Sequence, residues 1–368
     1  SDLDPIPQDD DANSGANRLD VISVVNKNEP IKVAEWNNPP AGFHNQDMHV
    51  DCDWEPANPV WAAEECHLFL YGADPYPEMV EGDSGTFYKG TQIFYVPLGF
   101  ESWNSMQTDE QQNDSRQILR WGGYSPEPDT TCGGSIFNHD NVFHIHPITG
   151  QKLLYVSYWD AGLRIVDVSN PPNIPDPEGV AWPQNNEVGR WLGCPSANDG
   201  WYGPDGGGHA NMTSEEWGGS TGALNGNGWI HYAVPYDHLL CNGAKDTDPM
   251  NTWDAECGTG PNDAEFGINW RHLTMIAPEY GTNTNHTGYI WTIDTTDPAK
   301  PFLVSKWKLP GSSILPDGTE HPHHYIPGGY IYSPHNGDTG TNGHVYWTHY
   351  HAGNWVTDHS DIWQDLEW

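Results

Sequence analysis

Short runs of alternating apolar and polar residues recur along this chain, and two of the runs share one pattern. Segments 155–169 and 346–360 carry identical residues at five of fifteen aligned positions, with a constant offset of 191 residues. Strict alternation predicts a half-buried β-strand. The shared Ala-Gly step predicts a tight turn, because Gly supplies the positive φ of a hairpin. Each copy therefore predicts a strand, a turn, a second strand and a final Asp/Ser turn.

Two further segments, 21–36 and 289–307, repeat the second half of this unit. Each has a β-rich run, a polar turn ending in Pro and a second alternating strand that ends in Trp. Segments 92–98 and 228–240 predict strands of more divergent units. Helix signals are confined to short patches such as 213–217.

Repeated antiparallel units of about 45 to 60 residues predict an all-β fold, a β-propeller of six or seven blades with long loops and few short helices. We expect a flexible acidic segment over residues 1–17 and a single propeller domain over 18–368. The strands of 21–36 and the incomplete C-terminal unit would share a blade and close the ring, which hides the sheet edges. A β-sandwich or a solenoid with the same hairpins is the alternative.

One copy of the unit carries a family resemblance. The segment Gly162-Leu-Arg-Ile-Val-Asp-Val-Ser-Asn-Pro171 resembles the LVIVD repeat, a propeller-blade motif of exported bacterial and archaeal proteins. The likeness is weaker over 288–307 and 345–360. It implies a propeller and an extracytoplasmic location, but no particular reaction. A fainter similarity in layout links the chain to copper-dependent propeller enzymes, such as methanethiol oxidases of the selenium-binding protein family and thiocyanate dehydrogenases, without a residue-by-residue match of active sites.

The charge and hydropathy of the chain exclude two classes of function. The net charge of −37 over 368 residues argues against a nucleic-acid partner, because a phosphate backbone is bound by basic surfaces. No apolar run reaches about 18 residues, so we do not expect the chain to span a membrane. The acidic balance suits salty surroundings, in which ions screen the self-repulsion.

Six cysteines, none in a CxxC motif, predict disulfides and an oxidising compartment. Two of the pairs would close short loops, each worth about 3 kcal/mol in the chain-entropy picture, and the third pair would join the remaining cysteines. Other connectivities among the fifteen stay open. We expect the protein to be secreted, periplasmic or on the cell surface. The predicted pairs are Cys52–Cys66, Cys132–Cys194 and Cys241–Cys257.

Histidine is abundant, at 19 residues, and three His-x-His pairs occur. Alternate side chains of a strand share a face, so each pair offers two imidazoles to one ion. The 191-residue offset also maps His144 onto His335. In a propeller the innermost strand of each blade lines the central channel, so equivalent His residues would converge there. The candidate metal ligands are His144, His146, His209, His323, His324, His335, His349 and His351.

Neutral imidazole binds copper, zinc, iron and nickel, whereas calcium prefers oxygen. A His site without thiolates in an oxidising compartment therefore predicts copper, with zinc or calcium as alternatives. A carboxylate such as Asp47, Asp140 or Asp160 would orient a ligand imidazole. The other interpretation is structural, because His at the start of a blade also hydrogen-bonds the backbone of a neighbouring blade.

These features predict an exported propeller with a copper site that acts as an oxidoreductase on a small molecule, with no catalytic residue assigned. The alternative is an extracellular or cell-surface binding or assembly module in which the His residues are structural and the partner is extracellular. A homo-oligomer is compatible with either. A hydrolase that uses zinc or a carboxylate pair is a third hypothesis. The sequence has no phosphate-binding loop of the GxxxxGK(S/T) type.

Overall fold

All elements that the computed structural model describes are β-strands, which confirms the all-β fold class. None of the described segments forms an apolar helix long enough to cross a bilayer. The helical patch predicted at 213–217 and the acidic segment 1–17 lie outside the described residues. The described residues are 19–24, 26–36, 43–55, 62, 65–73, 80–82, 85–87, 90–96, 119–124, 137–159, 162–169, 186–191, 230–237, 239–241, 270–278, 289–309, 334–340, 344–350 and 352–359.

The chain divides into two compact units. Unit 1 comprises Ser1–Ser125 and Pro171–Trp182, and unit 2 comprises Pro126–Asn170 and Pro183–Trp368. The number of blades, the single domain over 18–368 and the closure of a ring by the terminal strands stay predictions.

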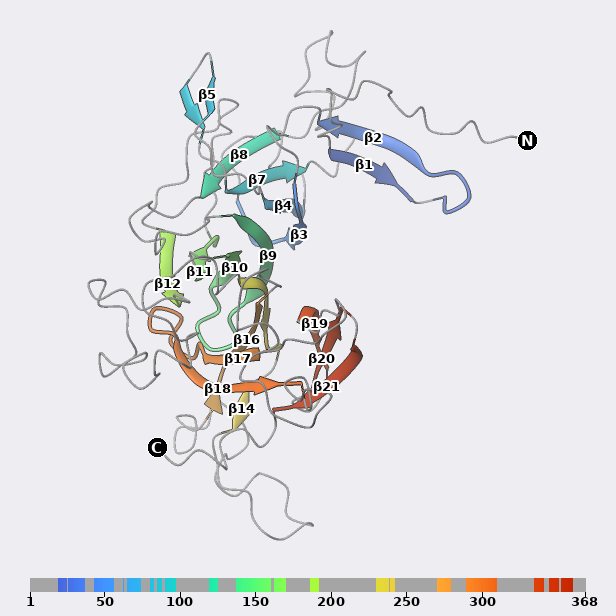
Figure 1. The fold of residues 1–368 in the computed structure, drawn as a ribbon. Helices are drawn as coiled ribbons and strands as arrows, with labels where there is room; N and C mark the ends of the chain where they lie inside the picture. The colour runs from blue at the N-terminus through green and yellow to red at the C-terminus, as the bar shows by residue number, and fades with distance from the viewer. Residues whose placement is uncertain are drawn as a thin grey trace, which may run out of the picture. The chain divides into compact units, whose positions relative to one another are not determined.

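Unit 1 contains one four-stranded antiparallel sheet and two hairpins (Figure 1). Its strands confirm the pair predicted over 21–36 and the strand predicted near 92–98. The sheet has the order β3 (Gln46–Asp51), β4 (His67–Ala73), β7 (Thr91–Val96) and β8 (Leu119–Tyr124). The hairpins are β1 (Leu19–Ser23) with β2 (Ile31–Trp36), and β5 (Val80–Gly82) with β6 (Gly85–Phe87).

A disulfide closes the connection between β3 and β4. It joins Cys52 to Cys66, 14 residues apart, which confirms the first predicted pair. The ring of Trp54 lies in the loop that the disulfide closes and packs edge-on against Phe69, with ring centroids 5.2 Å apart. The other two predicted pairs involve side chains outside the described residues.

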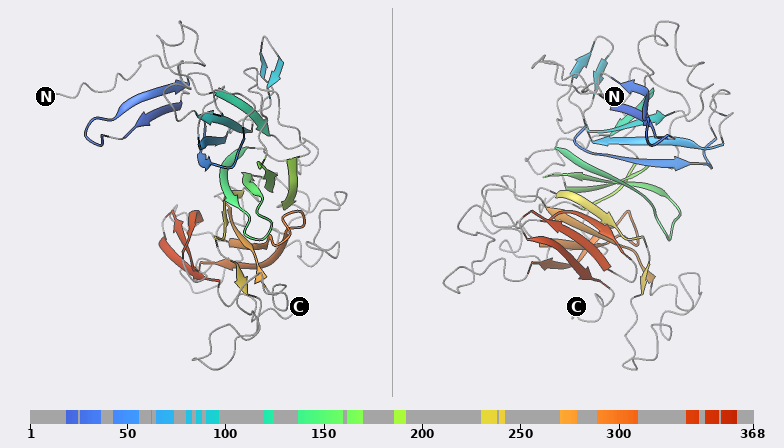
Figure 2. Two further views of the ribbon diagram at one scale, coloured as in Figure 1. Left: turned by 180° about the vertical axis from the view of Figure 1, so that it is seen from behind. Right: turned by 90° about the vertical axis from the view of Figure 1, so that its right-hand side faces the viewer.

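Unit 2 consists mainly of three antiparallel sheets whose strands follow one another in chain order, the arrangement that is typical of propeller blades. Figure 2 shows these sheets from two further sides, coloured green, yellow to orange, and red. The first sheet has β9 (Asn138–Ile145), β10 (Lys152–Tyr158), β11 (Gly162–Asp167) and β12 (Glu187–Trp191). The second has β13 (Ile230–Pro235), β16 (Leu273–Pro278), β17 (Tyr289–Asp294) and β18 (Phe302–Lys308). The third has β19 (Pro334–Thr339), β20 (His344–His349) and β21 (Gly353–Asp358), and a short pair joins β14 (Leu240–Cys241) to β15 (Trp270–Arg271).

The sequence repeat corresponds to a structural repeat in the first and third sheets. Strand β11 begins at Gly162 with φ 80°, and β21 begins at Gly353 with φ 76°. These two positions differ by the 191-residue offset, and both have the left-handed backbone that favours Gly over residues with a Cβ. The predicted Ala-Gly turn is therefore confirmed in both copies.

Two apolar layers hold the three sheets of unit 2 together. Tyr155 and Trp191 of the first sheet join Ile276 and Trp291 of the second in one buried cluster. A second cluster joins the other face of the second sheet to the third. At the first interface the main chains approach closely, because a Cβ at Gly189 would overlap the carbonyl oxygen of Pro298.

Candidate metal centre

The first strand of each of the three larger sheets in unit 2 carries a His as its second residue: His139 in β9, His231 in β13 and His335 in β19. Each of these His residues lies where the register shifts. In β9, Asn138 pairs with Tyr158 and Asp140 with Ser157, which leaves His139 as the extra residue of a bulge. Bulges re-aim side chains and are common beside functional sites.

The same irregularity occurs in the other two strands. Ile230 pairs with Pro278 and Tyr232 with Ala277, so His231 is the extra residue in β13. In β19 the pairing passes from Pro334 to Gly337 while β20 advances by only two residues, so the bulge contains His335. Three separate sheets thus present an imidazole from the same irregular position.

These three imidazoles lie side by side, because β13 adjoins both β9 and β19. The ring centroids of His139 and His231 are 3.9 Å apart, and those of His231 and His335 are 4.3 Å apart. His139 and His231 are only 3% and 1% exposed, whereas His335 is partly exposed. The bulge trio, defined as His139, His231 and His335, is therefore a mostly buried group of imidazoles.

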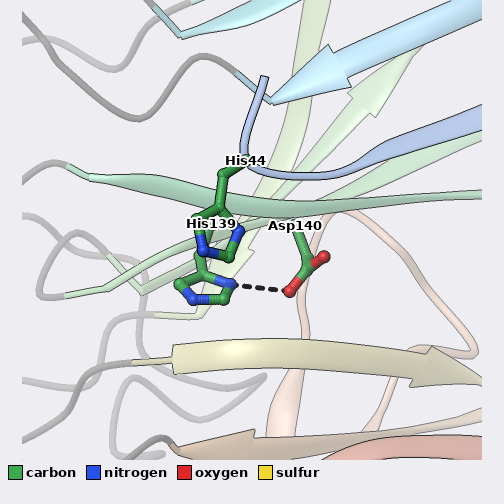
Figure 3. Close-up of side chains that lie close together, drawn as sticks. All are labelled: His44, His139 and Asp140. Carbon is green, nitrogen blue, oxygen red and sulfur yellow. Dashed lines mark hydrogen bonds and ion pairs between the residues drawn. The ribbon is translucent and has the colours of Figure 1, made fainter. Parts of the chain in front are cut away.

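A buried carboxylate accompanies the bulge trio. The Oδ2 atom of Asp140 lies 2.7 Å from Nδ1 of His139 and 3.7 Å from Nδ1 of His231. With the carboxylate as acceptor, the His139 proton resides on Nδ1 and the lone pair on Nε2, the tautomer that binds metals from a carboxylate–histidine pair. Figure 3 shows this hydrogen bond, together with His44, which belongs to unit 1.

Aromatic rings flank the trio at both ends. Phe137 and Trp159 are stacked, with centroids 4.3 Å apart, and lie 5.6 Å and 6.1 Å from the ring of His139. At the other end Tyr350 meets His335 edge to face, with centroids 5.0 Å apart. Apolar surroundings of this kind limit the access of water to a bound ion.

A second group of imidazoles lies at the interface of the first two sheets. The rings of His144 and His146 are 5.2 Å and 4.7 Å from that of His272. Nε2–H of His146 donates to the carbonyl oxygen of Thr295 at 2.8 Å, and its Nδ1 accepts from the backbone N–H of Thr149 at 3.1 Å. Both nitrogens of His146 are therefore used within the protein, which supports a structural role.

His272 is bonded in the same way. Its Nε2–H donates to the carbonyl oxygen of Tyr236 at 3.0 Å, and its Nδ1 accepts from the hydroxyl of Thr295 at 2.9 Å. Burial holds the pKa of His272 well below its usual value. Burial likewise lowers the pKa of His146, and it lowers that of His144 to about 4 although Asp237 lies nearby. All three imidazoles are thus neutral near pH 7.

The predicted metal ligands are dispersed over these features. His144 and His146 meet beside His272, and His335 meets His231, which the His-x-His pattern did not select. His349 ends β20, with its ring centroid 6.3 Å from that of Trp307. The remaining candidates, His209, His323, His324 and His351, lie outside the described residues.

The strand pairing corrects the equivalence of His144 with His335. Asn138 lies opposite Tyr158 and Pro334 opposite His349, and these two partners differ by 191. His335 is therefore equivalent to His139. The offset fails before β10 because ten residues separate Phe143 from its partner Leu154, whereas five separate Thr339 from Val345.

His231 was not selected from the sequence at all. Its signal is a single polar imidazole within the apolar run 229–235, next to the first residue of a strand. A polar residue inside an apolar run breaks the regular alternation of a strand. The extra residue of a β-bulge breaks the alternation in the same way.

Residues 151–174, which include β10 and β11, match the family model described as LVIVD repeat. Comparison with curated proteins and with solved structures finds no match for the chain. The fold and the match together define an all-β protein of antiparallel sheets that carries an LVIVD repeat.

Proposed function

We propose that this protein is an LVIVD-repeat β-propeller that binds a first-row transition metal at the bulge trio of His139, His231 and His335. Copper is the favoured ion, and zinc is the alternative. The observation that carries the proposal is the placement of a bulged His at the same strand position in three adjacent sheets.

The donor set supports this class of ion. Imidazole nitrogens bind at about 2.0–2.1 Å, so two ligands of one ion have nitrogens about 3–4 Å apart. The ring centroids of His139 and His231 are 3.9 Å apart and those of His231 and His335 are 4.3 Å apart, so neighbouring imidazoles of the trio are in ring contact. Three nitrogen donors and one carboxylate suit copper or zinc, whereas calcium takes six to eight oxygen ligands.

The proposal extends to an exported oxidoreductase that acts on a small molecule. Bound copper would supply one-electron chemistry, which zinc does not. In this proposal Asp140 holds the His139 imidazole in orientation through its 2.7 Å hydrogen bond, and the Phe137–Trp159 stack shields the site from water. The Cys52–Cys66 disulfide supports an oxidising compartment.

The test is the copper content and the EPR spectrum of protein purified gently from its native source, followed by reconstitution of variants. We expect His139→Ala, His231→Ala and His335→Ala to lose bound copper and its nitrogen-ligand spectrum. His344→Ala is the matched control, since its side chain is 41% exposed and lies outside the trio. Native protein without transition metal, or variants that retain copper like the control, would refute the proposal.

A second candidate function is an extracellular assembly module with structural His residues. The observation that favours it is the bonding of His146 to the carbonyl oxygen of Thr295, across the interface of two sheets. On this hypothesis His231→Ala lowers the melting temperature but leaves the metal content unchanged. The same set of variants therefore separates the two functions.

A further inference from the structure

The three larger sheets of unit 2 differ at their outer edges. The first and second sheets have four strands and end in β12 and β18, whereas the third has three strands and ends in β21 (Figure 1). Among the described strands, β21 therefore has a neighbour only on the side of β20. An edge strand of an antiparallel sheet directs the N–H and C=O groups of alternate residues away from the sheet, where another strand can pair with them.

The outer edges of the first two sheets carry features that oppose such pairing. Charged side chains, Lys above all, and β-bulges are the usual ones. Strand β12 contains Glu187 and Arg190, and its pairing with β11 has a register shift. Strand β18 contains Lys306 and Lys308, and its pairing with β17 also has a register shift. Both edges are therefore protected against a further strand.

Strand β21 has neither kind of protection. Its six residues, Gly353–Asp358, pair with β20 without a register shift and include no Lys or Arg. Gly353, Asn354 and Val356 are exposed. Val356 lies directly opposite Tyr346 of β20, and these two residues are 51% and 52% exposed. The third sheet thus presents a regular strand edge beside an exposed apolar pair.

We infer that this edge pairs with the same edge of a second copy of the chain, in a two-fold dimer with the two β21 strands antiparallel. A contact of this symmetry is self-complementary. The Asp358 residues of the two copies lie at opposite ends of the antiparallel pair, so these like charges do not face each other. In the merged sheet, Val356 and Tyr346 of both copies lie on one face and form a single apolar strip.

The charge of the chain favours this edge as the place of contact. Each copy has a net charge of −37, so two copies repel each other over most of their surfaces. Association therefore requires a contact strand with few carboxylates, and β21 has one, at its last residue. The inference is independent of the metal site.

Sedimentation velocity at several protein and salt concentrations tests the inference. We expect the wild type to form a dimer that becomes tighter between about 0.1 M and about 1 M NaCl, because the Debye length falls from about 10 Å to about 3 Å and the repulsion is screened. Val356→Lys and Asn354→Lys each place a Lys on the exposed edge strand, and each should weaken the dimer about tenfold or more. Ile148→Lys is the matched control, since it adds the same charge at a 44% exposed Ile in the turn between β9 and β10.

Each outcome decides the inference. A salt-dependent dimer that both edge variants weaken, and that Ile148→Lys does not, supports it. A wild type that stays monomeric at every salt concentration refutes it, as does a dimer that is equally tight in all three variants. If the wild type is monomeric and Val356→Lys melts well below Ile148→Lys, a strand of the same chain covers the edge, which also refutes the inference. Copper content should be the same in monomer and dimer, so failure of the dimer leaves the proposed function intact.

Discussion

His139 and His335 occupy the same position in two different sheets. His139 follows Asn138, the first residue of β9, and His335 follows Pro334, the first residue of β19. Asn138 pairs with Tyr158 and Pro334 pairs with His349, and these two partners are equivalent in the sequence repeat. His231 of the sheet between them repeats the position. Substitutions of single residues can test whether the trio binds a metal and what the residues around it contribute.

Asp140→Asn tests the carboxylate beside the trio. The substitution keeps the size of the side chain but removes the charge that orients His139, and loss of such a partner typically weakens metal binding about 10- to 100-fold. We expect a fall of that size in copper affinity, measured by competition with a chromophoric chelator. Asp237→Asn is the control, because that carboxylate is 61% exposed and lies beside His144. Equal affinities in the two variants would contradict the prediction.

The buried imidazoles predict a loss of stability in acid. Burial lowers the pKa of His144 and of His359 to about 4, and that of His272 well below its usual value. Since the unfolded chain binds these protons near pH 6.5 and the folded chain does not, stability falls as pH decreases from about 6.5 toward 4. Burial raises the pKa of Asp294, so the folded chain binds this proton more readily than the unfolded chain. This carboxyl group therefore adds stability as the pH falls toward its unfolded pKa, against the effect of the imidazoles.

Melting temperatures from pH 8 to pH 4 measure this effect. We expect a plateau above about pH 7 and a steady decrease below pH 6.5. His272→Gln, which does not titrate, should have a lower plateau and a shallower decrease, whereas the exposed His344→Gln should follow the wild type. A His272→Gln curve parallel to that of the wild type would show that this imidazole does not contribute.

Gly189→Ala tests the interface between the first two sheets. A methyl group there overlaps the carbonyl oxygen of Pro298, so the main chains must move apart. We expect a loss of about 3 kcal/mol or more in the free energy of unfolding, at the upper end of the overpacking range. Gly150→Ala is the control: it has φ 70° but open space around it, and left-handed strain costs roughly 1–2 kcal/mol. Chemical denaturation of both variants compares the two costs.

Replacing Cys52 and Cys66 together by Ser tests the disulfide of unit 1. Opening a loop of this length, 14 residues, is expected to lower the free energy of unfolding by about 3 kcal/mol. Copper content should not change, since the bulge trio lies in unit 2. Parallel measurement of denaturation and metal content checks both statements, and loss of copper in the Ser variant would contradict the second.

Local features of the fold were predictable from the sequence. The strand pairs at 21–36 and 289–307 and the turns before Gly162 and Gly353 depend on short-range alternation and on the φ of one Gly, so a window of about fifteen residues contains the necessary information. The Cys52–Cys66 pair was likewise favoured by a short loop. Blade number and ring closure depend on long-range packing, and they stay predictions.

The candidate site was predictable only in part. The sequence pattern selected His335 but paired it with His144, because a single offset was carried across a turn that differs in length by five residues between the copies. In the structure, Nε2–H of His146, a predicted ligand, donates to the carbonyl oxygen of Thr295. The spacing of side chains along one strand does not show which imidazole nitrogens are hydrogen-bonded to a neighbouring sheet.

The amino-acid sequence by itself determined that this chain forms antiparallel β-units with glycine turns, because those preferences act between residues close along the backbone. Only the tertiary structure decided which imidazoles meet. His139, His231 and His335 are separated by about a hundred residues each, and they come together because three bulges turn their side chains while packed sheets bring their strands alongside one another.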